Sequence, residues 1–478
     1  MTVFDAVLTA STALDVMAAS RGGAAAIAAR QSTRLARLRE SALRRSPFYR
    51  RCHHGLADAP LQALPPVQKT ELMESFDDWV TDPRVHLSDL LTFLRDPQRI
   101  GDAYAGSFVV WESSGSSGEP GVFVQDARAM AVYDAIESLR RSTPRPLQRW
   151  LDPLFIGERM AFVGATGGHF ATAVTVERLR RLNPWVAQSM RTFSILQPLS
   201  ALTAQLEEWA PSVLATYPTA AALLADEAQH GRLRINPDEV WTGGETLTPA
   251  MRHLIESGLA CSVRNSYGTS EFLPIAWECD EGLLHLNADW VILEPVDAQM
   301  RPVPPGELGS TTLLTNLANF VQPLIRYDVG DQVRFTDQPC GCGSALPAIE
   351  VHGRRDAVLQ MRGAAGRQIT LLPLALTTVL EEQAGLYDFQ LCQRDPTTLV
   401  LRVGTHGATA AAAVQRACTA LRGFAQQQGV MDVRVFAEAG VLPARGRTGK
   451  APRVVAAPAD KPAAVPAREP ERPKRSHS

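Results

Sequence analysis

Residues 213–271 have the sequence VLATYPTAAALLADEAQHGRLRINPDEVWTGGETLTPAMRHLIESGLACSVRNSYGTSE, in which strand-like and helix-like runs alternate. The apolar runs have the length of buried strands, and the first helical run begins with Pro218, a residue favoured in the first turn of a helix. In chain order the five runs are Val213–Tyr217, Pro218–His230, Glu239–Thr242, Thr248–Ser257 and Cys261–Ser266. Strands that alternate with helices of this length predict a parallel, doubly wound α/β sheet.

Two turns follow directly after strands of this predicted sheet. Gly243-Gly244-Glu245 comes after one strand, and Tyr267-Gly268-Thr269-Ser270-Glu271 comes after the next. Because parallel sheets bind ligands at the carboxyl ends of their strands, we expect both turns to lie on one rim of a ligand site. A glycine-rich turn alone is also a common simple connection. The two turns together favour a ligand site, because we expect the aromatic residue Tyr267 and the acid Glu271 to be exposed there.

A second candidate for ligand binding is the stretch Trp111–Gly121, between the strand-like runs Phe108–Trp111 and Val122–Val124. It concentrates small hydroxyls and glycines, namely Ser113, Ser114, Gly115, Ser116, Ser117 and Gly118. Serine hydroxyls donate hydrogen bonds to anionic oxygens, and glycine lets the backbone approach a ligand closely. The loop is not a Walker A motif, because no lysine follows Gly118 and a strand follows the loop. Taken alone, it fits a flexible linker as well as a phosphate-binding hairpin tip.

Length and composition bound the class of protein. A chain of 478 residues exceeds the size at which a single core stops growing, which predicts two domains. The formal net charge of -2, without a basic stripe interleaved with aromatics, argues against nucleic acid as a partner. Asp5 replaces a basic start, and neither a cleavable apolar stretch nor a membrane-length apolar run follows, so we expect a cytoplasmic protein with no membrane partner. Seven scattered cysteines fit a reducing compartment.

The rest of the chain predicts further units. His285–Tyr327 contains strand-like runs separated by proline and glycine turns, which predicts an antiparallel subdomain. Beyond Gly353-Arg354 the pattern predicts a small unit in the order strand, helix, strand, strand, helix, strand. We therefore expect a large N-terminal domain over 1–353, with the parallel sheet and the antiparallel subdomain, and a small α+β domain over 354–457. Proline, alanine and charged residues dominate 458–478, which predicts a disordered tail.

A separate set of residues has the composition of a zinc site. Cys279, His285, Cys340 and Cys342 combine three thiols with one imidazole, a normal tetrahedral zinc set. The Cys-x-Cys spacing is less typical of zinc sites than Cys-x-x-Cys. The set predicts one structural zinc ion, with idle thiols and a surface histidine as the alternative.

Five segments occur in an order and spacing that resemble a known family. They are Ser113–Pro120, Tyr267–Glu271, Tyr327–Asp331, Gly353–Asp356 and Gly446–Lys450. Over roughly Ser46–Val455 the chain resembles the AMP-forming, adenylate-forming ligases. Within that superfamily it is similar to the branch of phenylacetate-CoA ligases and deazaflavin-coenzyme adenylyltransferases. Some members of this branch have a similar arrangement of cysteines and histidine.

The resemblance implies roles for residues at the rim of the sheet and in the serine/glycine loop. Ser113–Gly118 would hold the β- and γ-phosphates of ATP through backbone N–H groups and hydroxyls. Tyr267 would stack on adenine, Ser270 would lie near the α-phosphate, and Glu271 would hold Mg²⁺. The remaining residues that we expect to contact the nucleotide at this rim are Gly243, Gly244, Glu245 and Gly268.

Four further residues complete the site that the resemblance implies. Asp331 would accept the ribose hydroxyls, and Arg354 would meet the ribose or a phosphate. Lys450 would bridge the substrate carboxylate and the α-phosphate, which stabilises charge as pyrophosphate leaves. Asp356 occupies the family's hinge position, about which a mobile C-terminal domain would rotate.

Two stretches leave part of this account open. Gly363–Gly366 replaces the loop that usually follows the hinge in the family, which leaves the geometry of thioester formation open. Gly164–Phe170, which contains His169, either lines the acyl or thiol pocket or is a simple connection after a strand.

The resemblance implies an AMP-forming ligase that activates a small carboxylic acid with ATP and Mg²⁺ to acyl-AMP and transfers the acyl group to coenzyme A. That the acid is aromatic rests on the resemblance alone. The alternatives are transfer to a carrier-protein thiol, adenylylation of a hydroxyl, and a non-catalytic nucleotide-binding protein. The last is disfavoured by the presence of both Lys450 and Glu271. A carrier protein and a homodimer are the macromolecular partners left open.

Overall fold

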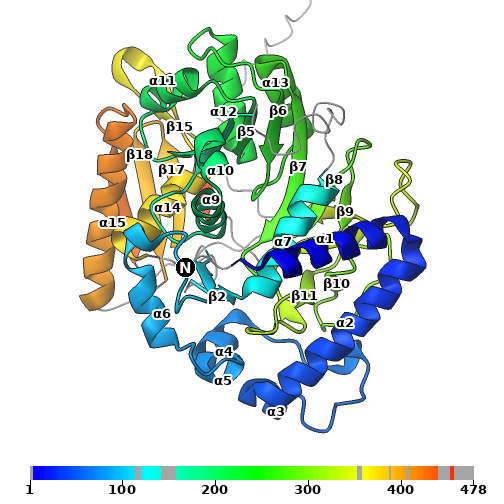
Figure 1. The fold of residues 1–478 in the computed structure, drawn as a ribbon. Coiled ribbons are helices and arrows are strands. Elements are labelled where there is room, and N and C mark those ends of the chain that lie inside the picture. The colour runs from blue at the N-terminus through cyan, green and yellow to red at the C-terminus, as the bar shows by residue number, and fades with distance from the viewer. Residues whose placement is uncertain are drawn as a thin grey trace, which may run out of the picture.

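The computed structural model of the chain describes residues 4–113, 120–141, 158–352, 358–386, 389–404, 408–439 and 453–456. Five neighbouring strands at one end of the largest sheet run parallel, namely β3 (Met160–Gly164), β4 (Met190–Ser194), β5 (Val213–Thr216), β6 (Glu239–Thr242) and β7 (Ser262–Thr269). Four more continue the sheet in antiparallel pairing, namely β8 (Phe272–Glu278), β9 (Leu284–Leu286), β13 (Gln332–Phe335) and β14 (Ala348–His352). The strand order is β13-β14-β9-β8-β7-β6-β5-β3-β4. Figure 1 labels the stretch from β5 to β9. The predicted parallel sheet is therefore confirmed, as one part of a mixed sheet.

Helices connect the parallel strands. They are α9 (Ala171–Leu182), α10 (Pro184–Ser189), α11 (Leu199–Trp209), α12 (Pro218–Gln229) and α13 (Pro249–Leu259). Proline opens α12 and α13 in the first turn, where its missing N–H leaves no hydrogen bond unmade. Val240 and Val263 on the strands and Leu224 on α12 are buried in one hydrophobic cluster with residues of α11 and α13, which packs these three helices on the sheet.

Strand β7 is longer than the sequence predicted. The predicted strand ended at Ser266, whereas β7 continues through Tyr267 to Thr269, so only Ser270 and Glu271 form the tight connection to β8. Antiparallel pairing with β8 accounts for the extension, because the backbone of the expected turn pairs with β8 instead. Tyr267 and Glu271 are each 9% exposed, so the expectation that both side chains are exposed is wrong.

The first third of the described chain ends in a helix that packs against the sheet. It contains α1 (Ala6–Arg21), α2 (Gly23–Arg45), α3 (Pro47–Cys52), η1 (Leu61–Ala63), α4 (Lys69–Glu74), α5 (Phe76–Trp79), α6 (Leu87–Leu94), η2 (Pro97–Arg99), β1 (Val109–Glu112), β2 (Val122–Gln125) and α7 (Ala127–Arg140). The strands β1 and β2 form the predicted hairpin. Asp126 caps α7 by accepting a hydrogen bond from the Ala129 amide at 2.9 Å. Helix α7 packs against β8 (Figure 1).

The predicted antiparallel subdomain is a three-stranded sheet of β10 (Val291–Val296), β11 (Thr311–Asn316) and β12 (Tyr327–Asp328). An isolated parallel bridge joins Val67 to Tyr327, and the Val67 amide donates to the Arg326 carbonyl at 3.0 Å. These contacts fix the segment before α4 against β12. No helix in the described part of the chain is long and apolar enough to cross a bilayer.

The C-terminal part forms the predicted α+β unit. It consists of the hairpin β15 (Leu359–Arg362) and β16 (Gln368–Leu371) with η3 (Ala364–Gly366) at its tip, then α14 (Pro373–Ala384), β17 (Phe389–Asp395), β18 (Thr398–Val403), α15 (Ala408–Gln427), β19 (Arg434–Ala439) and β20 (Val454–Val455). Its sheet has the order β19-β18-β17-β20. The Gln428 side chain donates to the carbonyls of Leu196 and Gln197, both at 3.0 Å, which ties this unit to the loop after β4. The predicted tail over 458–478 lies outside the described residues.

Candidate active site

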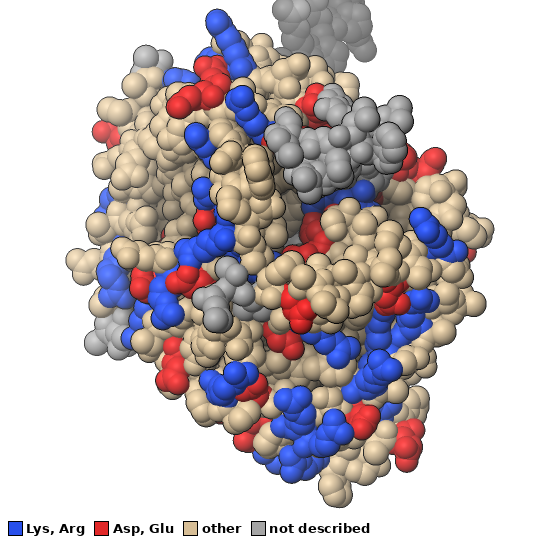
Figure 2. All heavy atoms as spheres, in the orientation of Figure 1, with Lys and Arg blue, Asp and Glu red and all other residues tan. Residues whose placement is uncertain are grey.

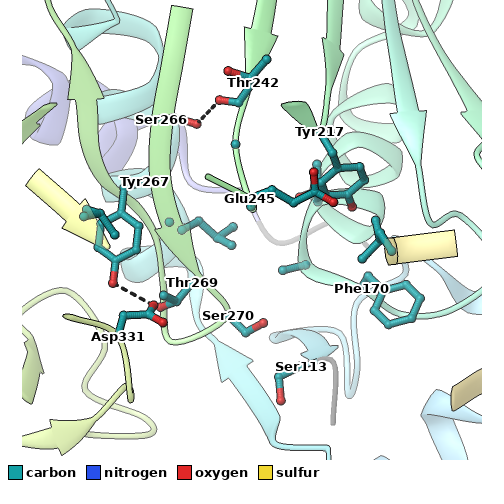
Figure 3. A pocket seen from close by; sticks show the side chains of 18 of the residues that line it. Ser113, Phe170, Tyr217, Thr242, Glu245, Ser266, Tyr267, Thr269, Ser270 and Asp331 are labelled. Carbon is teal, nitrogen blue, oxygen red and sulfur yellow. Dashed lines mark hydrogen bonds between the residues drawn. The ribbon is translucent and has the colours of Figure 1, made fainter. Parts of the chain in front are cut away.

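A cavity of about 980 Å³ opens at the carboxyl ends of β5, β6 and β7, as predicted for a sheet of this topology. Nine of the predicted nucleotide contacts line it, namely Ser113, Gly243, Gly244, Glu245, Tyr267, Gly268, Ser270, Glu271 and Asp331 (Figure 3). Other predicted functional residues lie outside the described chain, namely Ser114, Gly115, Ser116, Ser117, Gly118, Arg354, Asp356 and Lys450. Residues far apart in the sequence therefore meet at one site. Acidic and basic side chains are interspersed over the face seen in Figure 2.

Two hydrogen bonds link the end of β7 to the segment around β12. The Tyr267 hydroxyl donates to Asp331 Oδ2 at 3.1 Å, so the residues expected at adenine and ribose already lie side by side (Figure 3). The Tyr327 hydroxyl donates to Glu271 Oε1 at 2.8 Å. Burial raises the pKa of Glu271, while the bond from Tyr327 opposes that rise. A cation beside this carboxylate would favour its ionised form, which fits the expected Mg²⁺ ligand.

The glycines at the rim are required by close packing. A Cβ on Gly243 would lie 2.7 Å from Ser266 Oγ, and one on Gly268 would overlap the carbonyl oxygen of Leu273. Gly244 has φ +77°, a conformation that favours glycine. The carboxylate of Glu245 accepts hydrogen bonds from Thr219 at the start of α12, 3.1 Å from its N and 2.7 Å from its Oγ1. The structure thus gives Glu245 a role in holding α12, in addition to its place in the cavity wall.

Lys69 is a cavity residue that the sequence reasoning missed. It lies on α4, and a Cβ on Gly121, where the serine/glycine loop ends, would lie 3.2 Å from Lys69 Cδ. Its charge acts on Glu271, whose pKa it lowers slightly against the larger effect of burial. Composition held a signal, because the 48 basic residues include only four lysines: Lys69, Lys450, Lys461 and Lys474. Because this chain uses arginine at nearly all of its basic positions, a lysine indicates a position where a compact ammonium group is needed.

Three carboxylates meet where α14 faces the cavity. Burial, together with the charge of Glu381, raises the pKa of Glu112 to about 7. Burial and the charges of Glu112 and Glu381 likewise raise the pKa of Glu382 to about 7. Glu381 itself accepts a hydrogen bond from Arg453 Nη1 at 2.6 Å. Arg453 lines the cavity three residues after Lys450 in the sequence, so β20 is anchored at the site.

The segment Gly164–Phe170 lines the cavity only in part. Ala165 and Phe170 belong to the cavity wall. His169 is 1% exposed, and its Nε2 lies 2.9 Å from the Asp96 carbonyl oxygen, away from the cavity wall. Of the two interpretations left open for His169, the structure therefore supports the one in which it is not a pocket residue.

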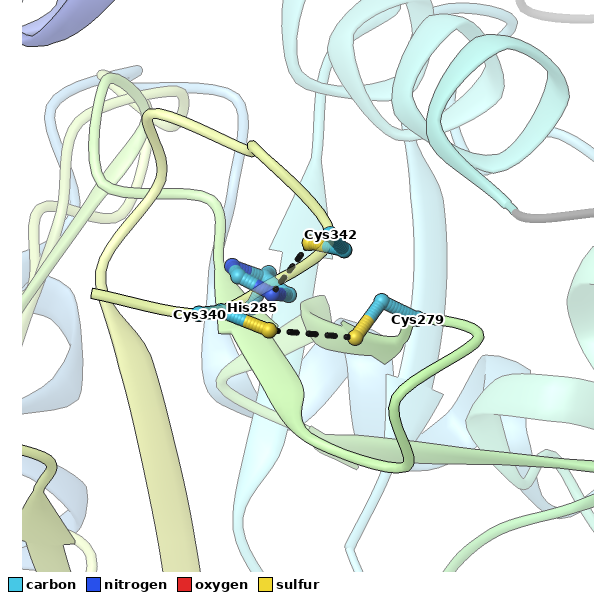
Figure 4. A group of neighbouring side chains, drawn as sticks. All are labelled: Cys279, His285, Cys340 and Cys342. Atoms are coloured by element: carbon cyan, nitrogen blue, oxygen red, sulfur yellow. Dashed lines mark hydrogen bonds between the residues drawn. The ribbon is translucent and has the colours of Figure 1, made fainter. Parts of the chain in front are cut away.

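Cys279, His285, Cys340 and Cys342 form one cluster where the connection between β13 and β14 meets the β8–β9 hairpin, with ligand atoms all within 4.8 Å of one another (Figure 4). Cys279 Sγ lies 3.7 Å from Cys340 Sγ, and Cys342 Sγ lies 3.3 Å from His285 Nε2. Tetrahedral zinc with thiolate bonds of about 2.3 Å separates its sulfur ligands by about 3.8 Å. The Leu346 carbonyl lies 2.8 Å from His285 Nδ1, which turns Nε2 toward the thiols. The donor set and spacing fit zinc.

Comparisons with known proteins agree with this fold. No protein family model matches the chain. The chain is 26% identical to phenylacetate-coenzyme A ligase of Thermus thermophilus over 356 residues, which cover 70% of this chain and 71% of that protein. It is 28% identical to protein CapK of Staphylococcus aureus over 136 residues, or 28% of this chain and 29% of CapK.

Solved structures of 2-hydroxyisobutyryl-CoA ligase share the architecture at 22% identity. The complex with 2-HIB-AMP and CoA in the thioesterification state has a TM-score of 0.55 and covers 90% of each chain. An open conformation with the same ligands has a TM-score of 0.50 and covers 90% of this chain and 91% of the other. The α/β fold with a C-terminal α+β unit is thus that of acyl-CoA ligases. This chain is thus similar in sequence to phenylacetate-coenzyme A ligase over 70% of its length and shares the fold of 2-hydroxyisobutyryl-CoA ligase.

Proposed function

We propose that the chain activates a small carboxylic acid with ATP to an acyl-adenylate and then transfers the acyl group to coenzyme A. The observation that carries the proposal is the convergence of the predicted nucleotide residues on one cavity at the carboxyl end of the parallel strands. The homology to a phenylacetate-coenzyme A ligase supports the same reaction class. Aromatic side chains in the cavity wall, including Phe170 and Trp241, support an aromatic acid.

Product analysis tests this proposal. Incubation with ATP, Mg²⁺, coenzyme A and a panel of carboxylic acids should yield AMP, pyrophosphate and an acyl-CoA thioester in equal amounts with at least one acid. Omission of the acid is the control. Formation of ADP and phosphate, or of AMP without a thioester, would contradict the proposal.

In the first half-reaction, each group near the triphosphate would stabilise part of its negative charge. Attack of the acid's carboxylate oxygen on the α-phosphorus forms the acyl-phosphate bond and releases pyrophosphate. The loop that begins at Ser113 and the ammonium of Lys69 would hold the β- and γ-phosphates, which is supported by the place of Ser113 and Lys69 in the cavity wall and of Lys69 beside Gly121. Glu271 is the ligand for Mg²⁺, which when bound neutralises phosphate charge. Lys450 supplies positive charge where it develops in the transition state.

The second half-reaction requires a different arrangement at α14. Glu112 immediately precedes the serine/glycine loop. Glu381 and Glu382 of α14 lie close enough to Glu112 for their carboxylate charges to interact. A triphosphate in that loop would face these carboxylates and be repelled, whereas an acyl-adenylate without pyrophosphate would not. We infer that the described arrangement suits thioester formation, and that rotation about Asp356 moves α14 away for adenylation.

Replacing Lys69 tests its place at the triphosphate. Lys69→Met should lower kcat/KM for ATP in adenylation by about 100-fold, because the positive charge that stabilises the leaving pyrophosphate is removed. Thioester formation from chemically supplied acyl-adenylate should be unchanged, and Lys69→Arg should recover part of the loss. Separate assays of the two half-reactions provide the measurement. An equal loss of activity in both half-reactions would indicate that Lys69 stabilises the fold and does not bind the phosphates.

We also propose one structural zinc ion bound by Cys279, His285, Cys340 and Cys342. A closed four-ligand site leaves no open position for catalysis and stabilises the fold. Protein purified without chelator should contain about one zinc ion per chain. Cys342→Ser should lose the metal and lower the melting temperature by roughly 5 °C or more, whereas Cys261→Ser, outside the cluster, should keep it. Metal-free protein of unchanged melting temperature would contradict the proposal.

A further inference from the structure

A line of polar side chains, Tyr133 and Glu137 of α7 and its C-cap Arg141, leads from a buried position to the wall of the cavity. Tyr133 and Glu137 lie four residues apart on one face of the helix, and the C-cap Arg141 follows and pairs with Glu137. Asn316 joins the first of them to the metal-ligand candidate, because its Nδ2 lies 3.1 Å from the Tyr133 hydroxyl and 2.9 Å from the Glu271 carbonyl. At 1.5 Å per residue, Arg141 lies about 12 Å further along the axis. The line therefore runs from the reacting end toward a distal end.

The distal end consists of an ion pair between two tryptophans. Arg141 pairs with Glu137, and its guanidinium carbon lies 3.5 Å from the ring centroid of Trp241 and 4.3 Å from that of Trp277. All four side chains belong to the wall of the same cavity as the nucleotide contacts. Trp241 is the second residue before Gly243, so this end lies about 7 Å from the rim along β6. A small acid spans such a distance.

One donor at this end lacks a partner. Trp277 is 8% exposed, and its indole Nε1 is buried without a hydrogen-bond partner in the described part of the chain. The neighbouring indole is satisfied, because Trp241 Nε1 donates to Glu239 Oε2 at 2.7 Å. Buried donors are nearly always paired, so an unpaired N–H in a cavity wall indicates a ligand acceptor.

We propose that this pocket end binds a hydroxyl group on the acid, at the end remote from the carboxylate that is activated. The inference rests on the proposed function. A hydroxyl accepts hydrogen bonds from Arg141 and Trp277 and donates one to Glu137, which matches all three groups. An amine would lie beside the guanidinium, and a second carboxylate would lie beside Glu137, so both would meet a like charge. The pair Glu137 and Arg141 is neutral as a whole, which favours an uncharged group.

Pyrophosphate exchange with matched acids tests the inference. Phenylacetate and benzoate are compared with their 4-hydroxy, 4-methoxy and 4-carboxy derivatives. The 4-hydroxy acid of a pair should have a kcat/KM about 100-fold above that of the unsubstituted acid, because a site built to bind a hydroxyl rejects the analogue without it. The methoxy acid, which cannot donate, should fall between them. Preference for the unsubstituted or the dicarboxylic acid would overturn the inference.

Variants separate binding of the hydroxyl from folding. Arg141→Met and Trp277→Phe should each reduce the preference for the hydroxy acid at least about tenfold, with less effect on the unsubstituted acid. Arg44→Met removes an exposed helical pair with Glu40 and should leave the preference unchanged. An unchanged preference in both cavity variants would overturn the inference while the proposed function stands. Absence of exchange with every acid would instead contradict the proposed function itself.

Discussion

Lys450→Ala is expected to lower the rate of acyl-adenylate formation by about 10³-fold, since a positive charge directed at the transition state is removed. Thioester formation from chemically supplied acyl-adenylate should survive far better. The expected reason is steric as well as electrostatic, because the thiol of coenzyme A must reach the same acyl-phosphate bond that we propose Lys450 contacts in the first step. Under the proposed mechanism, rotation of the C-terminal unit would separate the two steps.

The measurement is a separate assay of each half-reaction. Lys461→Ala is the matched control, because that lysine lies in the predicted tail, and it should leave both rates unchanged. Although Lys450 lies outside the described residues, Arg453 lies three residues later in the cavity wall. Equal loss of both half-reactions in Lys450→Ala would contradict the two-arrangement account and favour a single fixed site.

Glu271→Gln is expected to reduce adenylation by a similar factor of about 10³, because the neutral amide is a poor ligand for a hard cation. In the wild-type enzyme, protonation of the Glu271 carboxylate at low pH should likewise reduce adenylation. Burial raises the pKa of Glu271, so its protonated form, which cannot hold Mg²⁺, persists to a higher pH than for an ordinary glutamate. Adenylation at limiting Mg²⁺ should therefore fall as the pH decreases through that raised pKa.

Tyr327→Phe provides the matched test of this pH dependence. The Tyr327 hydroxyl donates to Glu271 Oε1 at 2.8 Å and stabilises the carboxylate, so its removal should move the acidic limb of the rate profile to higher pH. Raising the Mg²⁺ concentration should move the limb back to lower pH, because metal binding competes with protonation. An acidic limb that shifts neither in Tyr327→Phe nor with the Mg²⁺ concentration would show that it does not report protonation of a metal-binding Glu271.

The sequence predicted those features that depend on local pattern. The alternation over residues 213–271 was sufficient for the parallel sheet, because each run has its own period and length. The extent of β7 was missed, since Tyr267–Thr269 becomes strand through pairing with β8, a partner that follows a two-residue connection. The burial of Tyr267 and Glu271 results from the same pairing and from contacts with β12. The contact between Glu271 and Tyr327 of β12, 56 residues apart, has no signal in a single window of sequence.

Lys69 and Arg141 show which parts of the site could not be predicted from local pattern. Lys69 reaches the cavity because Val67 pairs with Tyr327, more than two hundred residues away in the chain. The helical spacing around Arg141 predicts a helix but not which face meets Trp241 and Trp277. Only the tertiary fold brings such side chains together. The scarcity of lysine was the one sequence signal available for Lys69.

Acid-dependent exchange of labelled pyrophosphate into ATP, measured without coenzyme A, tests the central claim most directly. It reports reversible formation of an acyl-adenylate and no later step. The account predicts exchange that requires a carboxylic acid and Mg²⁺, occurs in the absence of any thiol, and is lost in Glu271→Gln. Exchange that proceeds equally without acid, or none with any acid of the panel while ATP still binds, would contradict it.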